Sequence, residues 1–378
     1  YAGSSTHPHD RAKPKICLTL AELMNRSFAL DIARPFGTRS RYPIWLALPD
    51  RWASWAISGW WTGLKLIRQY RPQLIWSTYP IASAHLIAAR LQRSTGLPWI
   101  ADFRDPMVED DYPANLLQRA SHERIERRAA QHAATCVFVT EGTRRLYIKR
   151  YGEQFERKSC VIANGWDEDT LSAVKATPRP TGDSRLILLH SGFIDPSLRD
   201  PRAFFEAIAE LLREKRLAPN QLQVVLRGPS SDSFLSGLIT QHAIGSIVRI
   251  EPPVSHRDSL AEMLGADALL VLQASNCNDQ IPAKLYEYFG TRKPILGLTD
   301  PIGETAAAMR EAGVTTIANL HNKDEIKHKL LEFVDLLSRG AAPISSEAAA
   351  KAQTRRQKSL EVAGLFNRML AQIKPEAT

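Results

Sequence analysis

The chain of 378 residues has few cysteines and no long apolar run, and each absence excludes a class of protein. No stretch of 18 apolar residues occurs, so no transmembrane helix is expected. No signal peptide is expected at residue 1, and the sequence shows no solenoid repeat or known nucleic-acid-binding module. The four cysteines are widely spaced and match no metal-ligand pattern, which predicts reduced cytosolic thiols and leaves one disulfide pair open: Cys17, Cys136, Cys160 and Cys277.

The composition that is present is that of a soluble globular protein, with 44% hydrophobic and 24% charged residues. The length suggests about two domains. A net charge of +9 predicts attraction to anions, which include nucleotides, anionic lipid and nucleic acid. Charge alone does not choose among these partners.

Strand and helix patterns alternate along the chain at the spacing of βαβ units, which predicts parallel sheets. A stretch rich in Pro, Gly, Ser and Thr at 175–184 reads as a linker, so we expect an N-terminal domain over 1–174 and a C-terminal domain over 185–359. An amphipathic helix at 360–378 is expected to complete the first domain. The expected elements are helices at 51–70, 82–96, 116–133 and 201–214, and strands at 74–77, 98–101, 135–139, 159–163, 185–189, 223–226, 248–250, 268–272 and 294–298.

The segment 276–288, reading NCNDQIPAKLYEY, lies between two buried parallel strands. Pro282 stands where a helix begins, a position that tolerates proline well. The loop before it is expected at the carboxyl ends of the strands, where ligands bind in such sheets. The helix start favours a phosphate, Lys284 adds a charge, and Glu287 follows on nearly the same face. A phosphate followed by a hydroxyl-rich group would satisfy both side chains. The alternative is an ordinary helix start with an incidental Lys–Glu pair.

This segment resembles the nucleotide-sugar site of retaining GT-B glycosyltransferases of the family-four type, whose signature is an acid, seven residues and then Glu. Here Asp279 stands for the first acid and Glu287 for the second, with Pro282 between them. The resemblance implies that Glu287 binds the nucleotide ribose and that Asp279 lies near the donor sugar. It assigns the diphosphate to the backbone of the loop formed by Asn278, Asp279, Gln280 and Ile281.

Other phrases extend the likeness over about 40–378: STYPIASAH, GLPWIADFRDP, VTEGT, ANGWD, LHSGFI and VLRGP. They imply two Rossmann-like α/β domains with a cleft between them, the donor mainly on the C-terminal one and the acceptor on the other. They also imply sugar transfer with retention in bacterial cell-surface polysaccharide or glycoconjugate synthesis, with no metal or other cofactor. The acceptor would be a glycan or a lipid-linked sugar, and nucleic acid is not expected as a partner.

Four further residues are candidates for the chemistry. Arg227, at a strand end, is expected to clamp the diphosphate with Lys284, since guanidinium binds phosphate bidentately; the alternative is a solvated arginine. Ser191 and Gly192 would offer backbone N–H groups to the phosphate, or form an ordinary turn. Asp105 would lie near the acceptor, or form a structural pair with Arg104. The expected catalytic set is Asp279, Lys284, Arg227 and Asp105.

Nothing before Leu46 resembles the opening strand, Gly-rich loop and helix of the family. Either the first βαβ unit is missing or it has changed beyond recognition. The chain also does not begin with Met, so we expect a processed or truncated start. Two alternatives to transfer therefore stay open. One is a nucleotide-sugar epimerase or hydrolase on the same fold, and the other is a truncated homologue that binds nucleotide without catalysis.

Four tryptophans crowd the helix at 51–70 together with Lys65 and Arg68. Aromatic and basic residues on one helix suit a membrane interface, although packing against the sheet explains the tryptophans equally well: Trp52, Trp55, Trp60 and Trp61. The membrane interpretation predicts a cytoplasmic protein held peripherally at the inner face of the plasma membrane.

Overall fold

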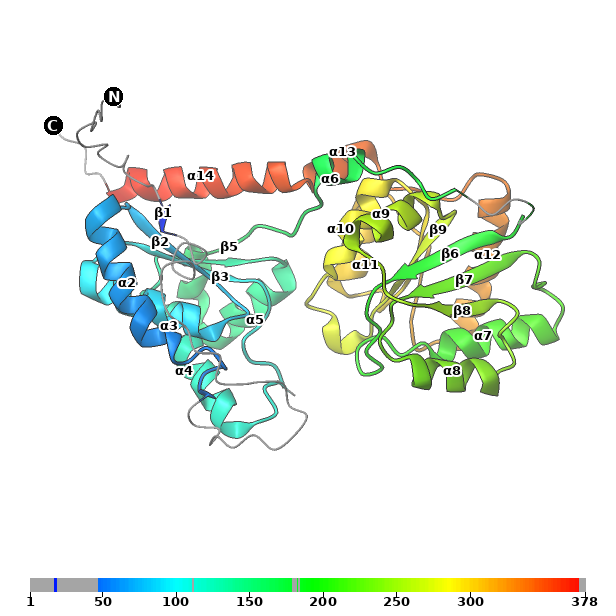
Figure 1. Ribbon diagram of the computed structural model, residues 1–378, viewed down its shortest axis with the longest axis horizontal. Helices are drawn as coiled ribbons and strands as arrows, with labels where there is room; N and C mark the ends of the chain where they lie inside the picture. Colours follow the sequence, from blue (N-terminus) through cyan, green and yellow to red (C-terminus); the bar gives the residue numbers. More distant parts are fainter. Residues whose placement is uncertain (1–16, 19–46, 111, 179–181, 183, 374–378) are drawn as a thin grey trace, which may run out of the picture. The chain divides into compact units, whose positions relative to one another are not determined.

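The computed structural model describes residues 17–18, 47–110, 112–178, 182 and 184–373. Contacts divide the chain into two compact units (Figure 1). Unit 1 comprises Tyr1–Ile162 with Leu370–Thr378, and unit 2 comprises Ala163–Met369. Among the helices that the structure places, none has the length and apolar content needed to cross a bilayer.

Unit 1 is built on a parallel sheet with the strand order β1-β2-β3-β4-β5. Its core is aromatic, with Trp55, Trp99, Phe103, Phe138 and Tyr147 almost fully buried. The strands are β1 (Cys17–Leu18), β2 (Leu74–Thr78), β3 (Trp99–Phe103), β4 (Thr135–Phe138) and β5 (Ser159–Val161). The main helices are α2 (Trp55–Tyr70), α3 (Ala82–Thr95), α4 (Leu116–His132) and α5 (Glu141–Tyr151).

Helix α2 begins four residues later than expected, and the Asp50 carboxylate before it bonds to Ser83 of α3. This carboxylate accepts a hydrogen bond from the Trp52 N–H at 2.8 Å and two more, also at 2.8 Å, from the N–H and hydroxyl of Ser83 at the start of α3. Asp50 therefore holds a turn against a neighbouring helix. The predicted end of α3 is confirmed, since Gly96 takes the left-handed conformation (φ 71°) that closes the helix.

Strand β1 was not expected from the sequence. Cys17 and Leu18 pair in parallel with Leu74 and Ile75 at the edge of the sheet. The rest of residues 1–46 lies outside the described residues, so the expected absence of the opening βαβ unit stays a prediction.

Unit 2 contains a parallel sheet with the strand order β11-β10-β9-β6-β7-β8. Apolar clusters fill both of its faces. The strands are β6 (Leu186–Ser191), β7 (Leu222–Arg227), β8 (Val248–Glu251), β9 (Ala268–Leu272), β10 (Ile295–Leu298) and β11 (Ile317–Ala318). The helices are α6 (Glu168–Ser172), α7 (Arg202–Arg213), α8 (Asp232–Gln241), α9 (His256–Gly265), α10 (Ala283–Thr291), α11 (Glu304–Glu311), α12 (Lys323–Ser338) and α13 (Glu347–Ala352). Helix α14 (Arg355–Ile373) passes from unit 2 into unit 1 at Leu370, so only the end of the helix expected at 360–378 joins the first unit.

The division between the units falls earlier than the expected linker at 175–184. Trp166 is buried in the apolar cluster of unit 2 and donates from its indole N–H to the Ala350 carbonyl at 2.8 Å. A Cβ at Gly290 on α10 would lie 2.5 Å from the Trp166 ring, so the ring rests directly on that helix. These contacts attach residues 163–174 to the second unit.

Candidate functional site

The predicted donor residues lie beside the point in the sheet of unit 2 at which the strand order reverses. From β6 the chain passes to β7 and β8 on one side, then to β9, β10 and β11 on the other. The connections that leave β6 and β9 therefore diverge, which creates the topological switch point where parallel sheets bind ligands. Ser191 ends β6, and the loop 273–282 follows β9.

The loop after β9 is held from below by one buried amide side chain. Gln273 donates from its Nε2 to the carbonyls of Cys277 at 2.8 Å and Gln280 at 3.0 Å. Thr305 of α11 donates to the other end of the same amide. Asn278, further along the loop, donates to the Asp300 carboxylate at 2.8 Å. Asn278, Gln280 and Ile281 are thus fixed in place before any ligand binds.

Lys284 lies in the first turn of α10 and reaches back to the end of β6. Its ammonium donates to the Ser191 carbonyl, and its Nζ lies 3.5 Å from Nε2 of His190. His190 is fully buried, and its Nδ1 lies 2.9 Å from the Leu270 carbonyl. Burial lowers the pKa of His190 well below its usual value, and Lys284 adds to the effect. The neutral ring therefore donates from Nδ1 to Leu270 and turns its acceptor, Nε2, toward Lys284.

The charge of Lys284 is only weakly compensated. The pKa of Lys284 is lowered to about 7, mainly by burial and next by the nearby guanidinium of Arg199, while Glu287 acts in the opposite direction. Arg199 belongs to the connection that leaves β6. Within the described residues, neither Lys284 nor Arg199 forms a salt bridge. Two neighbouring cations without a paired carboxylate favour an anionic ligand.

Helix α9 supplies partners to three of the predicted residues. His256 lies 3.0 Å from a carboxylate oxygen of Glu287, and the hydroxyls of Ser259 and Ser191 are 2.7 Å apart. Glu262 accepts a bidentate pair of hydrogen bonds from Arg227. The sequence patterns for donor binding did not indicate that α9 contributes to the site.

Arg227 lies at the end of β7, as expected, but its guanidinium is already engaged. It bonds Glu262, lies 3.6 Å from Glu251, and donates to the Pro252 carbonyl at 2.8 Å. To hold a diphosphate with Lys284, it would have to leave Glu262. Its role as a phosphate clamp therefore stays a prediction.

The backbone N–H groups of Ser191 and Gly192 also have protein partners. The first donates to the Tyr288 hydroxyl at 3.2 Å, and the second donates to the Arg227 carbonyl at 2.8 Å. Their expected contact with a phosphate would require these bonds to open. The absence of a side chain at Gly192 leaves room for Lys284, because a Cβ there would lie 2.7 Å from the Lys284 Nζ.

The two predicted acids lie in different units. Asp279 is exposed on the loop after β9, whereas Asp105 is exposed after β3 in unit 1. The buried acid at that strand end is Asp102, which accepts a hydrogen bond from the Thr78 hydroxyl at 2.9 Å. Burial raises the pKa of Asp102 to about 6, against the lowering effects of Thr78 and Arg104. Desolvation also raises the pKa of Asp105, so both carboxyls at this strand end are shifted in the same direction.

Sequence reasoning missed His190 and Arg199. His190 stands within the quoted LHSGFI phrase, but a buried histidine at a strand end carries no signal of its own. Arg199 lies seven residues after Gly192, in a connection without periodic pattern. Only the folded sheet brings it near Lys284. In the part of the chain that the structure describes, no group of three or more His, Cys, Asp or Glu is placed to hold a metal ion.

Comparison with known proteins places this geometry in a familiar context. Residues 29–165 match the model of the glycosyl transferase 4-like domain. No curated protein sequence matches the chain. The family model thus covers the N-terminal part of the chain, up to residue 165.

The fold is similar to solved structures over most of the chain. Sucrose-phosphate synthase from Thermosynechococcus elongatus shares 12% identity, with a TM-score of 0.64 over 90% of this chain and 82% of that one. A UDP-N-acetylglucosamine 2-epimerase shares 13%, with a TM-score of 0.50 over 90% and 82%. WaaG, a glycosyltransferase involved in lipopolysaccharide biosynthesis, shares 14%, with a TM-score of 0.50 over 77% and 83%.

At such identities the likeness establishes the fold alone, and the activity has to be inferred from the residues of the site. The expected fold class is confirmed: the chain is an α/β protein with two sheets of parallel strands, as in GT-B glycosyltransferases, and its N-terminal part matches a glycosyl transferase 4-like domain.

Proposed function

We propose that this protein transfers a sugar from a nucleotide-sugar donor to a glycan or lipid-linked acceptor, with retention of the anomeric configuration. The observation that carries the proposal is the Lys284 ammonium, which is held at the switch point by the Ser191 carbonyl, with Glu287 one turn along α10. Lys284 and the nearby Arg199 favour an anion at this point, and the Glu287 carboxylate stands where a sugar hydroxyl would follow. The proposed setting is bacterial cell-surface polysaccharide or glycoconjugate synthesis in the cytoplasm.

A nucleoside diphosphate fits these groups in one orientation. Its phosphates would lie against Lys284 and the start of α10, where the first amides of a helix lack partners within the helix. The ribose hydroxyls would then reach Glu287. That carboxylate is 23% exposed and bonds His256, so its position is set while one side stays open.

The reaction requires stabilisation of a leaving group more than it requires a base. The bond from the sugar C1 to the diphosphate oxygen breaks, and the bond from C1 to the acceptor oxygen forms on the same face. The acceptor proton passes to the departing phosphate oxygen, so no side chain has to accept it. Fixed positive charge at the diphosphate is then the main contribution of the protein, and one lost donor costs about 3–4 kcal/mol.

Calorimetric titration with UDP, GDP and ADP tests the donor site. We expect saturable binding of one nucleotide, and a loss of about tenfold or more in affinity in Glu287→Ala, because the ribose hydroxyls lose a charged acceptor. Glu347→Ala is the matched control, since that exposed carboxylate pairs only with Lys351. Equal affinity in Glu287→Ala and the wild type would exclude the ribose role.

Gly192 provides a test that changes no charged group. Gly192→Ala places a methyl group 2.7 Å from the Lys284 Nζ in a backbone with φ 111°. Displacing the ammonium should weaken nucleotide binding about tenfold. Gly340→Ala is the control, because Gly340 also has a positive φ (64°) but a Cβ there would enter open space, with nothing within 4 Å. If Gly192→Ala binds nucleotide as tightly as Gly340→Ala, the position of the Lys284 ammonium does not determine the affinity.

Retention and transfer are tested on the product. Nuclear magnetic resonance of the new glycosidic bond should show the anomeric configuration of the donor, and an inverted product would refute a retaining mechanism. The similar fold of an epimerase keeps one other activity in view. Incubation with donor alone distinguishes them: an epimerase converts the sugar nucleotide without any acceptor, whereas a transferase leaves it essentially intact.

A further inference from the structure

The two outer helices of unit 1 form a surface with an unusual charge composition. Residues 51–100 contain no Asp or Glu, although 40 of the 378 residues are acidic. The same stretch contains six cations: Arg51, Lys65, Arg68, Arg71, Arg90 and Arg93. It includes all of α2 and α3. We refer to the outer side of these two helices as the α2–α3 surface.

Helix α2 presents a ridge in which apolar residues precede basic ones. Ile57, Trp61, Lys65 and Arg68 are exposed at intervals of four, four and three residues, so they lie along one side of the helix. The fractional exposures of Ile57 and Trp61 are 63% and 56%. The four tryptophans therefore separate: Trp55 belongs to the core, while Trp61 faces outward.

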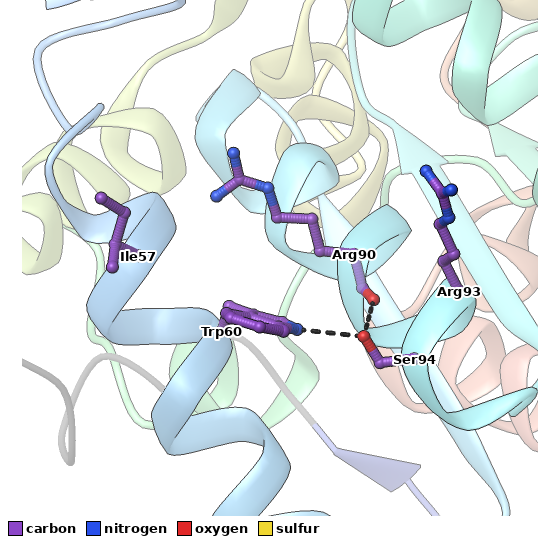
Figure 2. A pocket seen from close by; sticks show the side chains of 5 residues that line it. All are labelled: Ile57, Trp60, Arg90, Arg93 and Ser94. Carbon is purple, nitrogen blue, oxygen red and sulfur yellow. Dashed lines mark hydrogen bonds between the residues drawn. The ribbon is translucent and has the colours of Figure 1, made fainter.

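A cavity of about 320 Å³ lies beside this ridge, between α2 and α3. Figure 2 shows its lining residues, Ile57 and Trp60 from α2 and Arg90, Arg93 and Ser94 from α3. The Trp60 indole donates to the Ser94 hydroxyl at 3.3 Å, and Arg90 crosses to donate to the Ala56 carbonyl at 3.1 Å. These two bonds join α2 to α3 beneath the cavity, whose lining is mostly apolar, while the guanidinium groups of Arg90 and Arg93 point to different sides of it (Figure 2).

We propose that the α2–α3 surface docks the protein on an anionic lipid bilayer. In this arrangement Ile57, Trp61 and the largely apolar cavity beside Trp60 face the interface, and the exposed basic residues around them meet the lipid phosphates. Exposed tryptophan is typical of membrane interfaces, and each basic residue near an anionic leaflet adds to the binding. A protein partner would usually form discrete ion pairs between its carboxylates and a few basic residues. The diffuse negative charge of a bilayer instead suits a surface that has basic residues throughout and no acidic ones. The proposal does not depend on the donor site in unit 2.

Flotation with vesicles tests the proposal on the full chain. We expect binding to phosphatidylcholine vesicles that contain phosphatidylglycerol, and little binding to phosphatidylcholine alone. The double variants Ile57→Ser/Trp61→Ser and Lys65→Glu/Arg93→Glu should each lower the partition coefficient at least about tenfold. Leu360→Ser and Arg356→Glu are matched controls, since both residues are exposed on α14, and they should leave binding unchanged.

Three results would overturn the docking surface. The first is no binding of the wild-type chain to anionic vesicles, as expected if another segment covers α2 and α3. The second is an effect of the charge variant without any effect of Ile57→Ser/Trp61→Ser. The third is displacement by glycerol phosphate, which would identify a site for a free phosphate. Hydrogen exchange in peptides from unit 1 shows whether the variants keep that unit folded, and lost nucleotide binding with intact vesicle binding would count only against the proposed transfer.

Discussion

Lys284→Ala should lower turnover about a hundredfold or more, because it removes a buried charge that faces the diphosphate leaving group. The ammonium is held by two uncharged acceptors, the Ser191 carbonyl and Nε2 of His190, so its charge is not neutralised by its supports. The measurement is kcat with the donor identified by titration. Lys351→Ala, an exposed lysine paired with Glu347, is the control and should retain full turnover.

The pH dependence of nucleotide affinity provides a second readout for the same residue. The pKa of Lys284 lies near 7 without ligand, and a bound diphosphate favours the ammonium. Affinity should therefore be greatest below pH 7 and fall as the pH rises, by at most about tenfold per pH unit for one proton. The last pKa of a phosphate is about 6, and the ligand only becomes more negative above it, so the ligand does not cause this fall in affinity. A wild-type slope that persists in Lys284→Ala would show that another group titrates.

Glu126→Ala should destabilise unit 1 by about 3 kcal/mol, since it removes a buried acceptor shared by three donors. Glu126 is fully buried and accepts hydrogen bonds from the Tyr147 hydroxyl at 2.8 Å, the Tyr151 hydroxyl at 2.6 Å and the Arg150 guanidinium. Arg150 and Tyr147 in turn bind the backbone of Val108 and Met107. The network therefore joins α4 and α5 to the loop that carries Asp105.

Urea titration read by hydrogen exchange in peptides covering 116–151 measures this effect, because it isolates unit 1 from the rest of the chain. Glu123→Ala on the same helix is the control. Its carboxylate is 45% exposed and pairs only with Arg119, so the expected loss is below about 0.5 kcal/mol. Similar losses in the two variants would mean that the buried network adds nothing specific.

Periodicity in the sequence predicted most of the strands and helices, because apolar runs and turn residues act locally. The helix ends at Gly96 and before Pro72 agree with the expected bounds, since glycine tolerates the left-handed conformation that closes a helix and proline has no N–H to continue one. The start of α2 was misplaced because Asp50 binds Ser83, 33 residues away. A local pattern cannot show that choice of partner.

The candidate site shows the same limit more clearly. Lys284 and Glu287 follow from their spacing on one helix, and the structure keeps them together. The partner of Arg227 does not follow, since Glu262 is 35 residues away and belongs to α9. His190 and Arg199 enter only through the pairing of β6 with β9. Sequence thus identifies residues that act from one helix, and it misses those that meet across the sheet.

The seam between the two halves of the sheet in unit 2 has a consequence for how long the protein survives. Strand β6 pairs with β7 along its whole length, but with β9 only at Leu188 and Leu189. Lys284, from the β9 half, reaches across this seam to Ser191. A donor bound as proposed would bridge both halves, and at a hundred times its dissociation constant it would add about 2.7 kcal/mol to the folded state. The abundance of the protein in a cell would then follow the supply of its own substrate, since an empty seam opens more often to proteases than a filled one.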